Sequence, residues 1–190
     1  MSILLVGRCG TKTNPDADRY RELLKATIER QVDNLRVDFT ELALSNMESG
    51  RDALARLKVT VDPSKPDLVL WQFGLSNVFA RMPVDAFVAS TIEAIHWLNL
   101  RGLDVILIDL PYVRSLRTNF PYQTTRTAIA TIAKTANVAR ISNYDNIEEA
   151  EHGSLSASRR QTNAFALVQR ACLCTAEIAA QAIVASFRGK

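Results

Sequence analysis

Residues 3–16 have the sequence ILLVGRCGTKTNPD, in which an apolar run leads into a glycine-containing turn and then a helix start. Residues 3–6 have the length and composition of a buried strand, and residues 7–13 form the turn that leaves it. Ligand sites of α/β proteins gather on such turns. Three interpretations therefore compete: a phosphate-binding loop, a nucleophile supplied by Cys9, and a plain connection between strand and helix.

Further apolar runs alternate with helix-length segments along the chain. The pattern predicts helices over 14–35, 48–59, 83–102, 122–138 and 156–187, and strands over 3–6, 35–43, 66–74, 103–111 and 139–142. Strands separated by helices indicate a parallel sheet that is covered on both faces. With no repeat or linker, the sequence predicts one domain over residues 1–190, a three-layer α/β/α sandwich with a five-stranded parallel sheet.

Composition limits the classes of partner. The chain has 190 residues, is 47% hydrophobic and carries a net charge of +3 from 23 basic and 20 acidic residues. The basic residues form no run, so nothing indicates a nucleic-acid partner. No apolar stretch approaches the roughly 20 residues that span a bilayer. The first predicted strand begins at residue 3, which leaves no room for a signal peptide, and we expect a cytoplasmic protein without a membrane partner.

The three cysteines, Cys9, Cys172 and Cys174, are an odd number and lack the spacing of a metal site. We expect free thiols in a reducing compartment, with Cys172 and Cys174 as core or half-buried residues of the last helix. We expect no metal and no cofactor. His96 lies in the middle of a predicted helix, where a packing role is expected.

The phosphate-loop interpretation fails on spacing. The pattern GxxxxGK[ST] needs a glycine directly before the lysine, whereas Thr11 precedes Lys12 here. In that interpretation Asp109, at the end of an apolar strand, would hold magnesium, but an aspartate at this position often caps the next turn instead. A nucleotide-binding α/β protein is therefore kept as a secondary alternative.

Several segments together resemble the SGNH hydrolase family, also called GDSL-like esterases. In chain order they are ILLVGRCGT (3–11), SNMESGRDALARL (45–57), KPDLVLWQFGLSNVF (65–79), GLDVILIDLPYV (102–113) and a histidine just before the last helix. The strongest segment is the third, which is similar to the family block in which a strand beginning Pro-Asp ends in Gly-x-Asn-Asp. The resemblance implies a flavodoxin-like sandwich and a hydrolase or acyl-transfer enzyme acting on a small carboxylic ester.

The resemblance also assigns catalytic roles by position. The first block of the family is Gly-Asp-Ser with serine as nucleophile; here Gly7 is retained, while Arg8 and Cys9 replace the aspartate and the serine. The sequence EAEH has the spacing of the family's Asp-x-x-His, which assigns Glu149 as the orienting acid and His152 as the base. A thiolate at Cys9 would be favoured by the helix start, by Arg8 and by a histidine partner.

The oxyanion hole is expected to contain the backbone N–H groups of Cys9 and Gly50, since Gly50 matches the glycine of the family's second block. An ungapped match puts Ser76 where the family has its asparagine, and a shift of one residue puts Asn77 there. Arg8 and Arg114 are candidate contacts for an anionic substrate. Each residue also has a structural interpretation: Cys9 as a buried thiol, Ser76 and Asn77 as turn caps, and Arg114 as a solvated loop residue.

Two functions of different classes follow. The first is an esterase that acts on a small ester, such as an O-acetyl group on a sugar, through an acyl-Cys9 intermediate. The second is a non-catalytic binding or scaffold protein descended from that fold. The sequence leaves open the acyl group, the alcohol, the pathway and the oligomeric state.

Overall fold

The sheet has five parallel strands in the order β2-β1-β3-β4-β5. A computed structural model describes residues 1–7, 16–43, 50–73, 78, 83–154 and 164–188. The strands are β1 (Ser2–Val6), β2 (Asp38–Leu42), β3 (Leu68–Gln72), β4 (Asp104–Ile108) and β5 (Ala139–Ile141). The helices are α1 (Asp16–Gln31), α2 (Gly50–Ser64), α4 (Val84–Asn99), α5 (Phe120–Ala136), α6 (Asn143–Ser154) and α7 (Ala164–Arg188), with a short 3₁₀ helix, η1, at Arg114–Leu116. The predicted parallel α/β sheet is confirmed.

The central strands explain why the sheet is covered on both sides. Residues 3–6 of β1 and 68–71 of β3 are buried, as expected for parallel strands that face helices on both sides. The edge strand β2 instead exposes Asp38 and Glu41, and charged residues of this kind discourage pairing with another chain.

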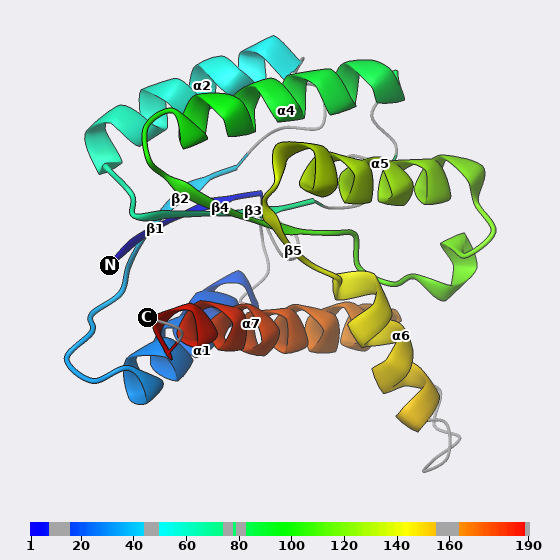
Figure 1. The fold of residues 1–190 in the computed structure, drawn as a ribbon. Helices are drawn as coiled ribbons and strands as arrows, with labels where there is room; N and C mark the ends of the chain where they lie inside the picture. The colour runs from blue at the N-terminus through cyan, green and yellow to red at the C-terminus, as the bar shows by residue number, and fades with distance from the viewer. Residues whose placement is uncertain (8–15, 44–49, 74–77, 79–82, 155–163, 189–190) are drawn as a thin grey trace.

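Helices form a layer on each face of the sheet (Figure 1). Helices α2, α4 and α5 cover one face, where Leu57, Ile95 and Ile129 belong to one apolar cluster with the sheet. Helices α1 and α7 cover the other face and pack against each other. There Leu24 of α1 and Ala179 of α7 belong to a second apolar cluster.

Several elements differ from the sequence prediction. Helix α1 ends at Gln31 rather than at residue 35, and β2 begins at Asp38 rather than at residue 35. Helix α6 occupies residues 143–154, a segment expected to connect the last strand to the last helix. Helix α2 continues past Val59 to Ser64. Helix α5 starts two residues early because Asn119 caps it, accepting the Tyr122 N–H at 3.0 Å. His96 is also corrected, since its side chain is exposed on α4 rather than packed.

All five strands point the same way, so their carboxyl ends lie at one edge of the sheet. The residues that follow β1, β2, β4 and β5 in the described chain are Gly7, Ala43, Asp109 and Ser142. Within the described ranges, no helix is long and apolar enough to cross a membrane.

Candidate active site

The turn after β1 begins at a residue that only glycine can occupy. Gly7 has a φ of +87°, and a Cβ at this position would lie 2.1 Å from the backbone oxygen of Gln72. Its N–H donates to the carbonyl of Leu42 at 3.0 Å, so the backbone is held between β2 and β3. The requirement for glycine at this position therefore comes from the close approach of three strands.

Most residues of the predicted nucleophile and oxyanion hole lie outside the described part of the chain, namely Cys9, Ser76 and Asn77. The predicted substrate contact Arg8 also lies outside it. Gly50 is described and is the first residue of α2, the helix that follows β2. The structure thus places one predicted oxyanion donor at a helix start after a strand, and the meeting of the whole set stays a prediction.

Glu149 and His152 both belong to α6. Residues three apart on a helix lie on the same side of it, so the two positions are neighbours. The Glu149 side chain is exposed, and the His152 side chain lies outside the description. The predicted spacing is therefore compatible with a pair on one helix face, whereas its approach to Cys9 is not described.

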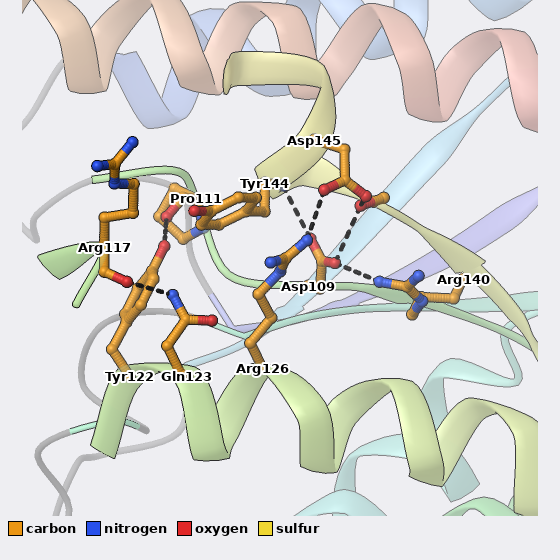
Figure 2. Close-up of polar contacts among 10 residues, drawn as sticks. Asp109, Pro111, Arg117, Tyr122, Gln123, Arg126, Arg140, Tyr144 and Asp145 are labelled. Atoms are coloured by element: carbon orange, nitrogen blue, oxygen red, sulfur yellow. Dashed lines mark hydrogen bonds and ion pairs between the residues drawn. The ribbon is translucent and has the colours of Figure 1, made fainter. Parts of the chain in front are cut away.

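Arg114 lies in η1, shortly after β4, and is exposed, as is Arg117. Helix α5 fixes the backbone of this segment, because the Gln123 side-chain amide donates to the Arg117 carbonyl at 2.7 Å (Figure 2). Both guanidinium groups thus belong to an anchored segment that follows a strand of the sheet.

The expectation of free thiols is wrong for Cys172. This residue is 2% exposed on α7, as expected of a core residue, but it is disulfide-bonded. Cys174 is half-buried and is not part of a disulfide. Cys9, the remaining cysteine of the chain, lies outside the described residues.

Asp109 follows β4 directly and is a buried acidic residue at this edge of the sheet. Its side chain is fully buried, and one carboxylate oxygen accepts the Tyr144 N–H at 3.0 Å. The other oxygen accepts from the Arg140 guanidinium at 2.5 Å (Figure 2). It also accepts from the Ser142 hydroxyl at 3.4 Å. Burial raises the pKa of Asp109, and the Tyr144 N–H and Arg140 oppose that shift.

The first turn of α6 is also bound to two further helices. Arg126 of α5 lies 3.6 Å from the centre of the Tyr144 ring and pairs with Asp145 at 2.5 Å (Figure 2). On the other side, the Thr175 hydroxyl of α7 donates to the Asn143 side-chain oxygen at 2.5 Å. The Asn143 amide nitrogen is buried and has no hydrogen-bond partner among the described residues. Residues 143–145 are therefore held by α5, α7 and the end of β4.

The sequence placed Asp109 either at a magnesium ion or at a turn. The structure supports the second interpretation, because the Tyr144 N–H binds one oxygen of the carboxylate and the Arg140 guanidinium binds the other. The correction is that Asp109 caps α6 rather than the turn that follows it. In the described residues, no group of His, Cys, Asp and Glu could hold a metal ion.

Residues 1–188 match the Non-GDSL lipase-like family. The structure is similar to that of TesA, with a TM-score of 0.70 and 14% identity over 97% of this chain and 99% of that one. A catalytic mutant of Axe2, an acetylxylan esterase from Geobacillus stearothermophilus, gives a TM-score of 0.68 and 15% identity over 94% and 93%. A lipase/acylhydrolase from Enterococcus faecalis gives 0.67 and 19% over 100% and 96%. None of the curated proteins matches the chain in sequence.

At these identities the solved structures show the fold alone. They confirm the predicted resemblance to SGNH hydrolases at the level of architecture. Together with the family match, they identify a divergent member of this group of lipase-like folds.

Proposed function

The chain belongs to the Non-GDSL lipase-like family, and from this premise we propose that it hydrolyses, or transfers the acyl group of, a small carboxylic ester with Cys9 as nucleophile. The observation that carries the proposal is the family match over residues 1–188. The geometry of Gly7 supports the proposal. Gly7 matches the glycine of the family's first block, and the structure leaves no room for a side chain at this position.

The proposed reaction requires Cys9 as a reduced thiol, hence the comparison with and without dithiothreitol below. His152 takes the proton of this thiol, and the Cys9 thiolate attacks the ester carbonyl carbon. The carbonyl electrons move to oxygen, and the oxyanion accepts hydrogen bonds from the N–H groups of Cys9 and Gly50 and from Ser76 or Asn77. Collapse expels the alcohol, which takes a proton from the His152 imidazolium, and leaves an acyl-thioester. Water then attacks the thioester with His152 as general base, releasing the carboxylic acid and restoring the thiol.

Glu149 has the orienting role in this proposal. A carboxylate on the second imidazole nitrogen of His152 fixes the tautomer and stabilises the imidazolium. The side-by-side positions of both residues on α6 support this pairing.

For the substrate we propose an O-acetyl ester on a carbohydrate. The support is the similarity in fold to an acetylxylan esterase. Arg8 and Arg114 are proposed to favour a substrate with a negative charge, and the exposure of Arg114 leaves its guanidinium available for that contact.

The assay measures p-nitrophenol release from p-nitrophenyl acetate and from a panel of sugar acetates. Because Cys172 is disulfide-bonded and Cys9 is the one cysteine left besides Cys174, each measurement is made with and without dithiothreitol. Cys9→Ala and His152→Ala should each lower kcat about a thousand-fold or more, and Glu149→Gln should lower it less. Cys174→Ala is the matched control for thiol background and should keep the wild-type rate.

The proposal of an esterase would be overturned by equal rates for the wild type and Cys9→Ala on every ester of the panel, both with and without dithiothreitol. The non-catalytic binding protein would then take its place.

A further inference from the structure

We propose that Asp109 is a positioning residue for this chemistry: its buried carboxylate fixes the first turn of α6 at the carboxyl edge of the sheet and thereby sets the direction of the helix that carries Glu149 and His152. The inference rests on the proposed function, because it concerns the two α6 residues that this function uses.

Asp109 caps α6 from a neighbouring strand, whereas a capping side chain usually belongs to the residue at the start of the helix itself. The first N–H groups of a helix lack partners inside it, and an anionic acceptor there also interacts favourably with the helix dipole. The Tyr144 N–H donates to the Asp109 carboxylate at 3.0 Å. Ser142 precedes the helix, but its hydroxyl donates to the Asp109 and Asp145 carboxylates.

The cap is rigid because its own position is fixed. Asp109 follows β4 directly, its side chain is fully buried, and its second oxygen is bound by Arg140 of β5 at 2.5 Å. Hydrogen bonds between ionised groups are shorter and stronger than neutral ones. The helix start is therefore tied to two strands of the sheet through one carboxylate.

The neighbouring contacts restrict the same turn from other directions. Arg126 of α5 contacts Tyr144 and Asp145, and Thr175 of α7 bonds to Asn143. The buried Asn143 amide nitrogen gains no partner in this arrangement, and an unsatisfied donor of this kind costs about 1–3 kcal/mol. The turn thus stays in place although one of its own polar groups has no partner in the part of the chain that the structure describes.

A small rotation of the first turn is amplified along the helix. Nine residues separate Asn143 from His152, which is about 13 Å at 1.5 Å per residue, so a tilt of about 5° moves the His152 backbone by about 1 Å. A misplacement of about 1 Å can reduce turnover about a hundred-fold. The cap therefore acts on the reaction through geometry and without touching the substrate.

The experiment compares wild type, Asp109→Ala and Asp109→Asn. Asn keeps an acceptor for the Tyr144 N–H and loses the charge, whereas Ala removes both. We expect Asp109→Ala to lower kcat about ten- to a hundred-fold with KM within about twofold, and Asp109→Asn to recover part of the loss. The pH profile of kcat/KM should shift in Asp109→Ala, because His152 is displaced from its partners.

Glu29→Gln is the matched control. Glu29 of α1 is also a mostly buried carboxylate that accepts a backbone N–H, from Val37 at 2.8 Å, and lies near an arginine, Arg36, at 3.7 Å. Glu29 thus joins α1 to the segment that enters β2, far in the chain from α6. This variant should keep the wild-type kcat and pH profile.

Hydrogen exchange gives a readout that is independent of activity. Asp109→Ala should accelerate amide exchange of residues 143–154 about ten- to a hundred-fold, while β3 stays protected. If Asp109→Ala does not fold, Asp109→Asn carries both measurements, with smaller effects in the same direction.

The outcomes separate the two proposals. An active wild type whose kcat and pH profile are unchanged in the Asp109 variants overturns the positioning role alone, as does unchanged exchange in α6. A wild type without esterase activity overturns the proposed function, and with it this role.

Discussion

Gly7 is held in place by the strands on both sides of β1. Its φ of +87° is unfavourable for any other residue, and a Cβ would lie 2.1 Å from a backbone oxygen that cannot move without disturbing β3. Gly7→Ala should therefore lower the free energy of unfolding by about 3 kcal/mol or more, or about 6–12 °C in Tm for a chain of this length. Thermal unfolding followed by circular dichroism measures the change.

Gly102 provides the matched control for this substitution. It also has a positive φ, +72°, but nothing lies within 4 Å of its ideal Cβ. Gly102→Ala should show the backbone strain alone, about 1 kcal/mol. Equal losses in the two variants would contradict the argument that close packing of β1 against β3 makes Gly7 necessary.

At the scale of elements, the start of α5 offers a clean test of capping. The Asn119 side chain accepts the Tyr122 N–H at 3.0 Å, and Pro121 in the first turn needs no partner for an N–H. Asn119→Ala should destabilise the protein by about 1 kcal/mol, while Asn119→Asp should keep most of the stability. Urea denaturation decides between them, and an Ala variant as stable as the Asp variant would rule out the cap.

The two missed helix starts show what local sequence can and cannot reveal. The signal for α5 was present as Asn119 followed by Pro121, so its earlier start could have been predicted. The acceptor at the start of α6 lies elsewhere: Asp109 and Tyr144 are 35 residues apart in the chain. The sequence also held a local signal for α6, because Ser142 and Asp145 have the spacing of a capping box and their side chains contact each other. Only the contribution of Asp109, which comes from the end of a neighbouring strand, leaves no local pattern.

The strands were predictable for the opposite reason. Apolar runs such as residues 3–6 are buried on both faces of the sheet. A continuous apolar run of this length is itself the sequence signal of a buried parallel strand, so no distant residue is needed to predict it. For the candidate site, chain order predicted that Gly50 follows a strand, and it is the first residue of α2. The pairing of Glu149 with His152 came from the family resemblance and stays a prediction, although both positions lie on α6. The disulfide of Cys172 was not predictable, because cysteine pairing depends on distances that spacing does not contain.

At the scale of the whole molecule, a parallel sheet brings the segments after its strands to one edge. Gly7, Gly50 and Asp109 come from distant parts of the chain, and each follows a different strand of this sheet. The described residues at this edge hold the backbone in place, through a glycine that admits no side chain and through a buried carboxylate. In the proposed enzyme, the reacting groups are carried by the turns and helices that these residues anchor.

Asp109 also makes a pH-dependent contribution to the stability of the whole molecule. Burial raises its pKa in the folded state, despite Arg140, Arg126 and the N–H groups of α6, so the folded protein binds this proton more tightly than the unfolded chain does. The stability contributed by this group is then fully present below its unfolded pKa of about 4 and is lost as the pH rises through the folded value.

The Asp109→Asn variant has no carboxyl group that titrates at this position. The contacts that the asparagine side chain makes do not change with pH in this range. The stability of the wild type minus that of Asp109→Asn should therefore fall as the pH rises from about 3, and level off once Asp109 is ionised in both states. Urea unfolding of both proteins across a pH series measures this difference, and taking the difference cancels the carboxylates that titrate alike in the two proteins. A difference that rises with pH would mean that Arg140 and the helix N–H groups outweigh burial and hold the folded pKa of Asp109 below its ordinary value.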